Sequence, residues 1–416
     1  MIQCGKTGIT PTTECKKIPL PSKKTLDRRI AHYSHASRIM ELTKGEVDQY
    51  QRHLSLKNFG LQKQLKLKES SVLVVGAGGL GCPALQYLSA AGVGKIGIID
   101  DDVIDSSNLQ RQILFTHEDI GLPKAQKAAE RLSLSNPHIQ IKAYVERLTA
   151  ENARNLFQDY DVIVDGTDNF LSRYLINDAC ILFDKPLIHG SINQFDGMVS
   201  VFNLNGGPTY RCLFPEQPDP SSIPSCAEAG VLGVLPGIIG CWQAMEAIKV
   251  LTEIGSTLSG KLLMYNALSQ VTRVIKIDPT PQSREIEDLS STFETCSPHS
   301  CSSSNDIIEI SSEELAKMIK AEEVFQLLDV RESWERSQSR ILSSLHQPLG
   351  ELINSSVVSP HKDLNRSINL VIYCKAGIRS RMACEALKSI GFTRLYNLSG
   401  GMDDWGQSHP ELCQSD

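Results

Sequence analysis

Residues 71–100 read SVLVVGAGGLGCPALQYLSAAGVGKIGIID, and the rest of the chain is organised around this stretch. Its opening run, up to Val75, is apolar and β-branched, which is typical of a strand buried on both faces. A glycine-rich turn over 76–81 follows and leads into a predicted helix over 83–91. A strand, a glycine turn and a helix N-terminus predict a phosphate site, because backbone N–H groups and the helix dipole favour negative charge there.

The turn and the next strand predict a nucleotide. Gly78 and Gly79 let the backbone approach a ligand closely, and Gly81 lets the helix pack on the strand. A second predicted strand, 95–99, ends at Asp100, whose carboxylate can hold ribose hydroxyls. These features alone leave both NAD and ATP open.

Three residues beyond the second strand favour ATP. They are Asn108, Arg111 and Lys124, and they are more polar and cationic than a hydride-transfer site requires. Such residues suit an enzyme that stabilises charge on a triphosphate. We therefore expect ATP rather than NAD.

Composition limits the class of protein. The 416 residues suggest two or three domains of about 150 residues each. The 41% hydrophobic and 22% charged residues are typical of a globular protein, and the net charge of −6 provides no basic surface for nucleic acid. Scattered cysteines favour a reducing compartment over a disulfide scaffold. The apolar run 230–245 is shorter than a membrane span, so we expect it in the core.

The chain divides into four segments. Residues 1–42 form a basic extension that we expect to be disordered, with a transit peptide as the alternative. Alternating strands and helices over 43–278 predict an α/β domain with an open parallel sheet, whose ligands lie at the carboxyl ends of the strands. A Ser- and Pro-rich linker over 279–305 precedes a small α/β domain, 306–412.

Two more segments of the larger domain carry candidate site residues. A capping-box pattern, Thr43 with Glu46, opens a predicted helix that contains Arg52. A buried strand over 160–164 leads into DGTDN, which places Asp168 at the carboxyl end of a strand.

These motifs resemble a known family. Arg52, GAGGLGCP, SSNLQRQ, Lys124 and DGTDN stand in the order and spacing of the ThiF/MoeB adenylyltransferases, relatives of the ubiquitin-activating enzymes. The C-terminal part resembles a rhodanese domain through DVRE, CKAGIRS and SGGMDDW. The domain order is similar to that of the fused, MoeZ-like adenylyltransferase/sulfurtransferases.

The resemblance implies a Rossmann-like adenylation domain that uses ATP and Mg²⁺. Asp168 would hold Mg²⁺. Arg52 would be an arginine finger that reaches into a partner subunit, which implies a homodimer; the alternative is a solvated helix-face arginine. The implied nucleotide-binding residues are Gly76, Gly78, Gly79, Asp100, Ser107, Asn108, Leu109, Gln110, Arg111, Lys124, Asp168 and Asn169.

The implied reaction is attack by the C-terminal Gly-Gly carboxylate of a ubiquitin-like sulfur-carrier protein on the α-phosphorus of ATP. Arg52, Arg111, Lys124 and Asp168 would act electrostatically, because the reaction needs no protein nucleophile. The second partner would be a persulfide donor such as a cysteine desulfurase. We expect a cytoplasmic enzyme without nucleic-acid or membrane partners, and the basic extension leaves organellar import open. The carrier decides between molybdopterin, thiamine, cysteine and tRNA thiolation.

Cys374 is the expected sulfur carrier. It follows an apolar strand and precedes a helix, so its sulfur should lie among loop N–H groups, which lower a thiol pKa and stabilise a persulfide. Lys375, Arg379 and Arg381 would add positive charge nearby. The residues expected to brace this domain are Asp329, Arg331 and Glu335.

Two departures from the family pattern stand out. Many relatives bind zinc with two CxxC pairs, but here Thr209 stands where the first pair with Cys212 would begin, and Cys296 and Cys301 lie in the linker. We therefore expect no zinc site. Residues 339–344 lack the glycine–histidine–isoleucine–proline–glycine pattern of rhodaneses.

The remaining cysteines receive two interpretations. Cys226 matches a cysteine that in some relatives forms a thioester or disulfide with the carrier and in others is dispensable, and both interpretations stay open. The cysteines expected to be small core residues of helices are Cys82, Cys180, Cys241 and Cys384.

Two other functions remain as alternatives. One is a dinucleotide-dependent oxidoreductase fused to a sulfurtransferase, and the other is a non-catalytic scaffold that binds ubiquitin-like folds. Carrier-dependent ATP–pyrophosphate exchange separates both from the adenylyltransferase.

Overall fold

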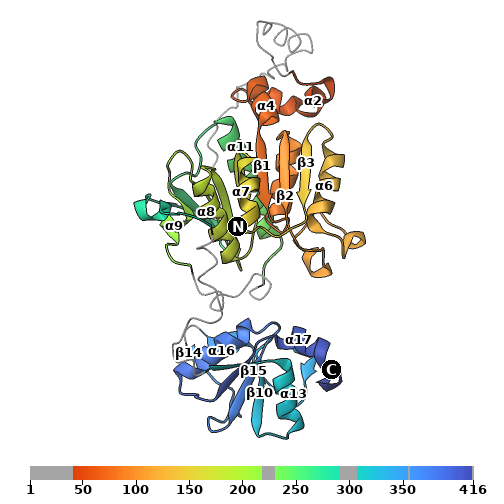
Figure 1. The fold of residues 1–416 in the computed structure, drawn as a ribbon, viewed down its shortest axis with the longest axis vertical. Coiled ribbons are helices and arrows are strands. Elements are labelled where there is room, and N and C mark those ends of the chain that lie inside the picture. Colours follow the sequence, from red (N-terminus) through yellow and green to blue (C-terminus); the bar gives the residue numbers. More distant parts are fainter. Residues whose placement is uncertain (1–40, 218–229, 290–306, 355–356, 415–416) are drawn as a thin grey trace, which may run out of the picture. The chain divides into compact units, whose positions relative to one another are not determined.

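The computed structural model describes residues 41–217, 230–289, 307–354 and 357–414. They form a larger domain up to residue 289 and a smaller one from residue 307, each built on its own sheet (Figure 1). Residues 1–40 of the expected extension, Cys226 and most of the expected linker lie outside the described residues.

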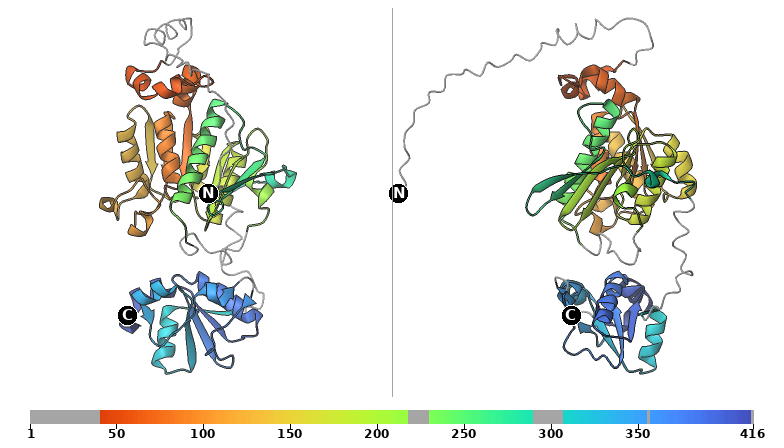
Figure 2. Two further views of the ribbon diagram at one scale, coloured as in Figure 1. Left: turned by 180° about the vertical axis from the view of Figure 1, so that it is seen from behind. Right: turned by 90° about the vertical axis from the view of Figure 1, so that its left-hand side faces the viewer.

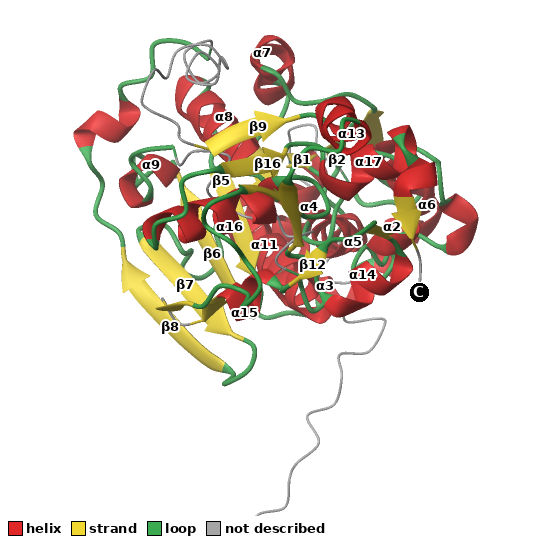
Figure 3. Ribbon diagram, turned by 90° about the horizontal axis from the view of Figure 1, so that it is seen from below, coloured by secondary structure: helices red, strands yellow, loops and turns green. Residues whose placement is uncertain are grey.

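The larger domain is built on an eight-stranded sheet of order β3-β2-β1-β4-β5-β6-β7-β8. The first five strands are parallel, and the last three continue the sheet in antiparallel fashion, as Figure 3 shows for β5 to β8. The strands are β1 (Ser71–Val75), β2 (Lys95–Ile99), β3 (Gln140–Tyr144), β4 (Val162–Asp165), β5 (Leu187–Asn193), β6 (Asp196–Phe202), β7 (Lys261–Asn266) and β8 (Val271–Lys276).

Helices cover both faces of this sheet because the side chains of β1 alternate. Val72 and Val74 pack with α5, α6 and α11, whereas Leu73 and Val75 pack with α7 and α8. Seen from behind in Figure 2, α11 (green) lies in front of the sheet. The helices are α2 (Lys44–Gln49), α3 (Gln51–Leu54), α4 (Gly60–Glu69), α5 (Gly81–Ala91), α6 (Lys124–Ser135), α7 (Ala150–Gln158), α8 (Phe170–Leu182), α9 (Tyr210–Leu213) and α11 (Val234–Thr252).

Helix α11 is longer than its sequence suggested. It runs for 19 residues, and among the described residues it is the one helix long and apolar enough to cross a membrane. Half of its apolar window is buried in the domain, where it packs on α5 and on strands β5 and β6. The expected core segment is therefore present, but the expectation that the run is too short was wrong.

The expected linker begins inside the packed domain. Residues 279–289 lie against the sheet domain, with Leu289 in the same core cluster as α7 and α8. A cluster of hydroxyls around Cys212 holds this segment. The Cys212 sulfur accepts from the Thr280 amide at 3.3 Å and lies 3.0 Å from the Ser283 hydroxyl, while the Thr209 amide donates to it at 3.3 Å.

The smaller domain has a parallel five-stranded sheet of order β12-β10-β15-β16-β9. Its strands are β9 (Ile307–Ile310), β10 (Phe325–Asp329), β12 (Leu345–His346), β15 (Asn369–Tyr373) and β16 (Leu395–Leu398). Two short antiparallel pairs lie outside this sheet: β11 (Arg340–Ile341) pairs with β17 (Cys413–Gln414), and β13 (Ile353–Asn354) pairs with β14 (Val357–Val358). Its helices are α13 (Ser312–Lys320), α14 (Ser333–Gln338), α15 (Leu349–Leu352), α16 (Ile378–Ser389) and α17 (Gly401–Ser408).

The segment that departs from the rhodanese pattern is an ordered part of this domain. Ile341 is fully buried and pairs with Cys413 through β11 and β17. Ser343 adopts a left-handed φ of 62°, a conformation that favours glycine. The chain therefore makes this turn with a serine.

The hydroxyl cluster predicts a pH dependence. Although burial raises the pKa of Cys212, the donors Ser283, Thr280 and Thr209 lower it to about 6. A cysteine thiol in the unfolded chain has a pKa of about 8.5. The contribution to stability is therefore fully present above about pH 8.5 and is lost as the pH falls through about 6.

We expect Cys212→Ser to lower the free energy of unfolding by on the order of 1 kcal/mol at pH 8.5, because solvent screens this partly exposed site, and by less at pH 6. Calorimetric unfolding of the full chain at both pH values measures the difference. The control is Cys241→Ser, whose sulfur is half-buried on α11. Equal destabilisation at both pH values would contradict a thiolate.

Candidate active site

A cavity of about 460 Å³ lies at the carboxyl edge of the parallel strands of the larger domain. Of the residues predicted from the sequence to hold a nucleotide, those that line it are Gly76, Gly78, Gly79, Asp100, Asn108, Arg111, Lys124, Asp168 and Asn169. The parallel order of β1, β2 and β4 brings these separate segments to one edge.

The glycine turn has the backbone geometry that the sequence predicted. Gly76 has a φ of 93°, and a Cβ on Gly81 would lie 1.9 Å from the Gly76 carbonyl oxygen. Gly81 therefore lets α5 pack directly on the strand end. A Cβ on Gly78 would meet only the Gln112 side chain, at 3.9 Å, so this part of the turn is open to a ligand.

Asp100 supports the turn as well as facing the cavity. Its carboxylate accepts hydrogen bonds from the amide of Ala77 at 2.7 Å and from the amide of Asp102 at 2.9 Å. Burial raises the pKa of Asp100, and these amides and Lys124 oppose the rise. The remaining lone pairs of the carboxylate can accept ribose hydroxyls.

Two of the cations that line the cavity, Lys124 and Arg111, already have partners. Lys124, which is only 5% exposed, donates to the Asp102 carboxylate at 2.7 Å. Arg111 donates to the Ser107 carbonyl at 3.0 Å. Asp102 itself is well exposed, so a bound phosphate can replace it as the partner of the lysine.

Asp168 presents a carboxylate that no described residue satisfies. It is exposed on the cavity wall, next to Asn169, whose side chain accepts from the Ser172 amide and caps α8. A carboxylate without protein donors, beside cations that suit phosphate, fits the oxygen ligands that Mg²⁺ prefers.

The structure adds one buried cation that the sequence analysis missed. Arg173 lines the cavity, is 7% exposed, and contacts the Thr167 carbonyl at 3.4 Å, while its Nε has no partner among the described residues. The signal was its position in the first turns of a helix that follows a strand end, because such residues face the ligand edge of an α/β sheet.

Other predicted residues do not line the cavity. Ser107 is exposed beside it, Leu109 is half-buried behind it, and Gln110 lines a different groove. Arg52 is exposed on α3, where the neighbouring His53 bonds Gln64, and Gln64 in turn bonds the last residue of α5, Ala91. Since α5 starts at the cavity and is about 16 Å long, Arg52 lies at the opposite edge of its own sheet.

In the smaller domain, Cys374 has the predicted setting. It follows β15 and is fully buried, and its sulfur accepts from the Gly377 amide at 3.1 Å and the Ser380 hydroxyl at 3.4 Å. Gly377 has a φ of 94°, and a Cβ there would lie 2.2 Å from the Ser399 carbonyl oxygen. Only glycine therefore fits this loop.

The expected cluster of cations around Cys374 needs correction. Arg379 is buried and makes two 2.7 Å bonds to Glu335, and Arg381 pairs with Glu309 and Glu385. These arginines are neutralised by carboxylates, and of the three cations only Lys375 is exposed. The bracing role of Asp329, Arg331 and Glu335 is confirmed, because Arg331 makes two bonds to Asp329.

Three of the four cysteines expected in the core are buried: Cys82, Cys180 and Cys384. Cys241 is the exception, since it lines an apolar groove between α5 and α11. Among the described residues, no group of three His, Cys, Asp or Glu side chains could hold a metal ion.

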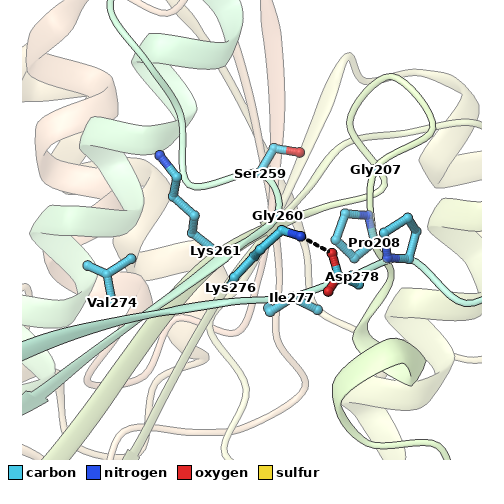
Figure 4. Close-up of a pocket in the computed structure, with 10 residues that line it drawn as sticks. Gly207, Pro208, Ser259, Gly260, Lys261, Val274, Lys276, Ile277 and Asp278 are labelled. Carbon is cyan, nitrogen blue, oxygen red and sulfur yellow. Dashed lines mark ion pairs between the residues drawn. The ribbon is translucent and has the colours of Figure 1, made fainter.

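A second hollow, of about 640 Å³, lies where strand β7 begins and strand β8 ends (Figure 4). Lys276 and Asp278 form an ion pair across it, and Pro208 and Ile277 provide apolar walls. None of the predicted site residues lines this hollow.

Comparisons with known proteins match both domains. The ThiF family matches residues 50–286, and the rhodanese-like domain matches residues 311–408. The probable adenylyltransferase/sulfurtransferase MoeZ of Mycobacterium tuberculosis is 40% identical over 381 residues, which cover 89% of this chain and 96% of that protein. The sulfur carrier protein adenylyltransferase of Thermus thermophilus is 52% identical over 248 residues, or 58% of this chain and 92% of that protein.

A solved structure supports the fold of the larger domain. It is E. coli MccB with MccA-N7isoASN, which is 20% identical, has a TM-score of 0.50, and covers 58% of this chain and 74% of that chain. Because the family match spans more than half of the chain, this protein is a member of the ThiF family with a C-terminal rhodanese-like domain, and it is an adenylyltransferase/sulfurtransferase enzyme.

Proposed function

We propose that this enzyme adenylates the C-terminal glycine of a ubiquitin-like sulfur-carrier protein and then passes persulfide sulfur from Cys374 to that carboxyl group. The observation that carries the proposal is the convergence of the glycine turn, Asp100, Lys124 and Asp168 on one cavity. The name of the Thermus relative supports a sulfur carrier as the acceptor.

The adenylation site works through charge and position. The carrier carboxylate attacks the α-phosphorus of ATP, and pyrophosphate leaves with the bonding electrons. Lys124 and Arg111 offer donors to the phosphate oxygens where charge builds up. Asp168 would hold Mg²⁺, which neutralises phosphate charge when bound.

The sulfur site works through backbone donors. The Gly377 amide and the Ser380 hydroxyl, which contact the Cys374 sulfur, would stabilise its persulfide anion. Attack by this persulfide on the acyl-adenylate would release AMP and leave an acyl disulfide, which a second thiol must reduce to the thiocarboxylate. A persulfide donor such as a cysteine desulfurase would reload Cys374, and a reducing, cytoplasmic location suits this thiol. Cys226 remains a candidate for the second thiol and lies outside the described residues.

In a homodimer, Arg52 would act in the active site of the partner subunit. The residue lies too far from the cavity of its own chain to touch a nucleotide there. An apolar groove of about 1170 Å³ between α5 and α11 adjoins the cavity through Arg111, and its wall includes the exposed Tyr87 and Val234. A second copy seated in this groove would be close to the nucleotide.

The alternatives fit the site less well. An oxidoreductase gives no role to Asp168, and a non-catalytic scaffold gives none to the buried Lys124 or to the loop around Cys374. Carrier-dependent ATP–pyrophosphate exchange tests the proposal directly.

The two chemistries are expected to separate by mutation. Asp168→Ala should lose about two orders of magnitude of exchange rate, because removal of one transition-state charge contact costs about 3 kcal/mol. The same variant should still transfer sulfur through Cys374 to cyanide. Cys374→Ala should do the reverse: exchange stays near wild type, and thiocarboxylate formation stops. Wild-type thiocarboxylate formation by Cys374→Ala would show that another residue carries the sulfur.

Arg52 is expected to act in the partner's site. Arg52→Ala and Lys124→Ala homodimers should each be inactive in exchange. After subunit exchange at equal amounts, half of the dimers are mixed and each holds one complete site, so about a quarter of wild-type activity should return. Mass spectrometry of differently tagged subunits verifies the mixing, and no recovery in proven heterodimers counts against the role.

A further inference from the structure

A buried polar pair lies directly beneath the cavity. Asp165 ends β4 and His189 lies beside it on β5, as partners in the register of these parallel strands. The Asp165 Oδ2 atom and the His189 Nδ1 atom are 2.8 Å apart, and each residue is 1% exposed. The imidazole ring also packs against Phe202 and Tyr210.

The protonation of the pair follows from its surroundings. Burial raises the pKa of Asp165, but the His189 hydrogen bond and the charge of nearby Arg173 outweigh burial and bring the pKa below its usual value. Burial lowers the pKa of His189, and Asp165 only partly opposes it. Since an ionised carboxylate can only accept, a neutral imidazole donates its Nδ1–H to Asp165.

The other oxygen of Asp165 shapes the turn that carries Asp168. Asp165 Oδ1 accepts from the Thr167 amide at 3.0 Å and from the Thr167 hydroxyl at 2.7 Å. Gln243 of α11 donates to the Asp165 carbonyl at 2.6 Å from the opposite face of the sheet. The turn is thus fixed at Asp165 and at Thr167. The next residue, Asp168, lines the cavity.

We propose that the His189–Asp165 pair is a positioning device for the metal-binding carboxylate of Asp168. His189 fixes the rotation of the Asp165 side chain, Asp165 fixes Thr167, and Thr167 fixes the backbone from which Asp168 extends. This inference rests on the proposed function, since it takes Asp168 as the Mg²⁺ ligand. Sequence patterns do not reveal it, because the pair forms only through the register of β4 and β5.

A matched pair of variants tests the hydrogen bond. His189→Asn keeps an N–H near the position of Nδ1, whereas His189→Leu fills similar space without a donor. Direct binding of Mn²⁺, measured by electron paramagnetic resonance with a non-hydrolysable ATP analogue present, should weaken at least about 10-fold in His189→Leu and less than about 3-fold in His189→Asn. The Mg²⁺ concentration for half-maximal exchange should rise by the same factor, while binding of the analogue without metal stays within about 2-fold.

Thr167→Val provides the second test, because it removes the hydroxyl donor at a half-buried position with almost no change of shape. It should weaken Mn²⁺ binding in the same direction. Calorimetry verifies that each variant is folded. Wild-type Mn²⁺ binding by folded His189→Leu and Thr167→Val, with binding lost in Asp168→Ala, would overturn the positioning role and leave the proposed function intact. Wild-type Mn²⁺ binding by Asp168→Ala would overturn the role of Asp168 as the metal ligand and the positioning role with it, whereas absence of carrier-dependent exchange in the wild type would overturn the proposed function.

Discussion

The nucleotide cavity depends on the close approach of two backbone turns. A Cβ on Gly76 would lie 2.9 Å from the Gly166 carbonyl oxygen, and a Cβ on Gly166 would lie 2.8 Å from the Gly76 carbonyl oxygen. Strands β1 and β4 are parallel neighbours, so both turns leave the sheet at one edge. The glycine turn and the turn of Asp168 are therefore held by direct backbone contact, without side chains between them.

The two active sites use charge in opposite ways. In the larger domain, Lys124 is paired with the exposed Asp102, a partner that a phosphate can replace. In the smaller domain, the Arg379–Glu335 pair is buried and bidentate. Glu335 therefore neutralises the charge of Arg379, and the pair holds the loop that follows Cys374. Stabilisation of the Cys374 sulfur is then left to uncharged donors from the backbone and from Ser380. The ion pair of the larger domain is thus open to replacement, whereas that of the smaller domain is part of its buried structure.

The sequence predicted the features that local patterns encode. The glycine turn, Asp100, Lys124, Asp168 and the strand before Cys374 all follow from short motifs at fixed offsets. The two domains and the parallel part of the larger sheet follow from alternation of strands and helices.

The features that were missed arise from contacts between distant segments. The sequence around His189 shows only an apolar strand. The contact of His189 with Asp165 appears only when β5 is paired with β4. Thr280 and Ser283 have the same spacing as Thr209 and Cys212, but this pattern holds hydroxyls in place of the cysteines of a zinc site and predicts no contact by itself. Strand β8 was not predicted, because every one of its residues is exposed and its sequence shows no alternation of apolar and polar residues. Helix α4 escaped because its apolar residues are few.

The exposed strand β8 has a consequence for how this protein behaves when concentrated. It forms one end of the eight-stranded sheet, so the N–H and C=O groups of its outer side are available to pair with another chain. Val274 and Ile275 are 56% and 49% exposed, and their burial against another chain would favour such pairing. Arg273 interrupts the apolar run with a positive charge, which opposes pairing with an identical strand. High salt screens this charge and so weakens its opposition to aggregation at the β8 edge.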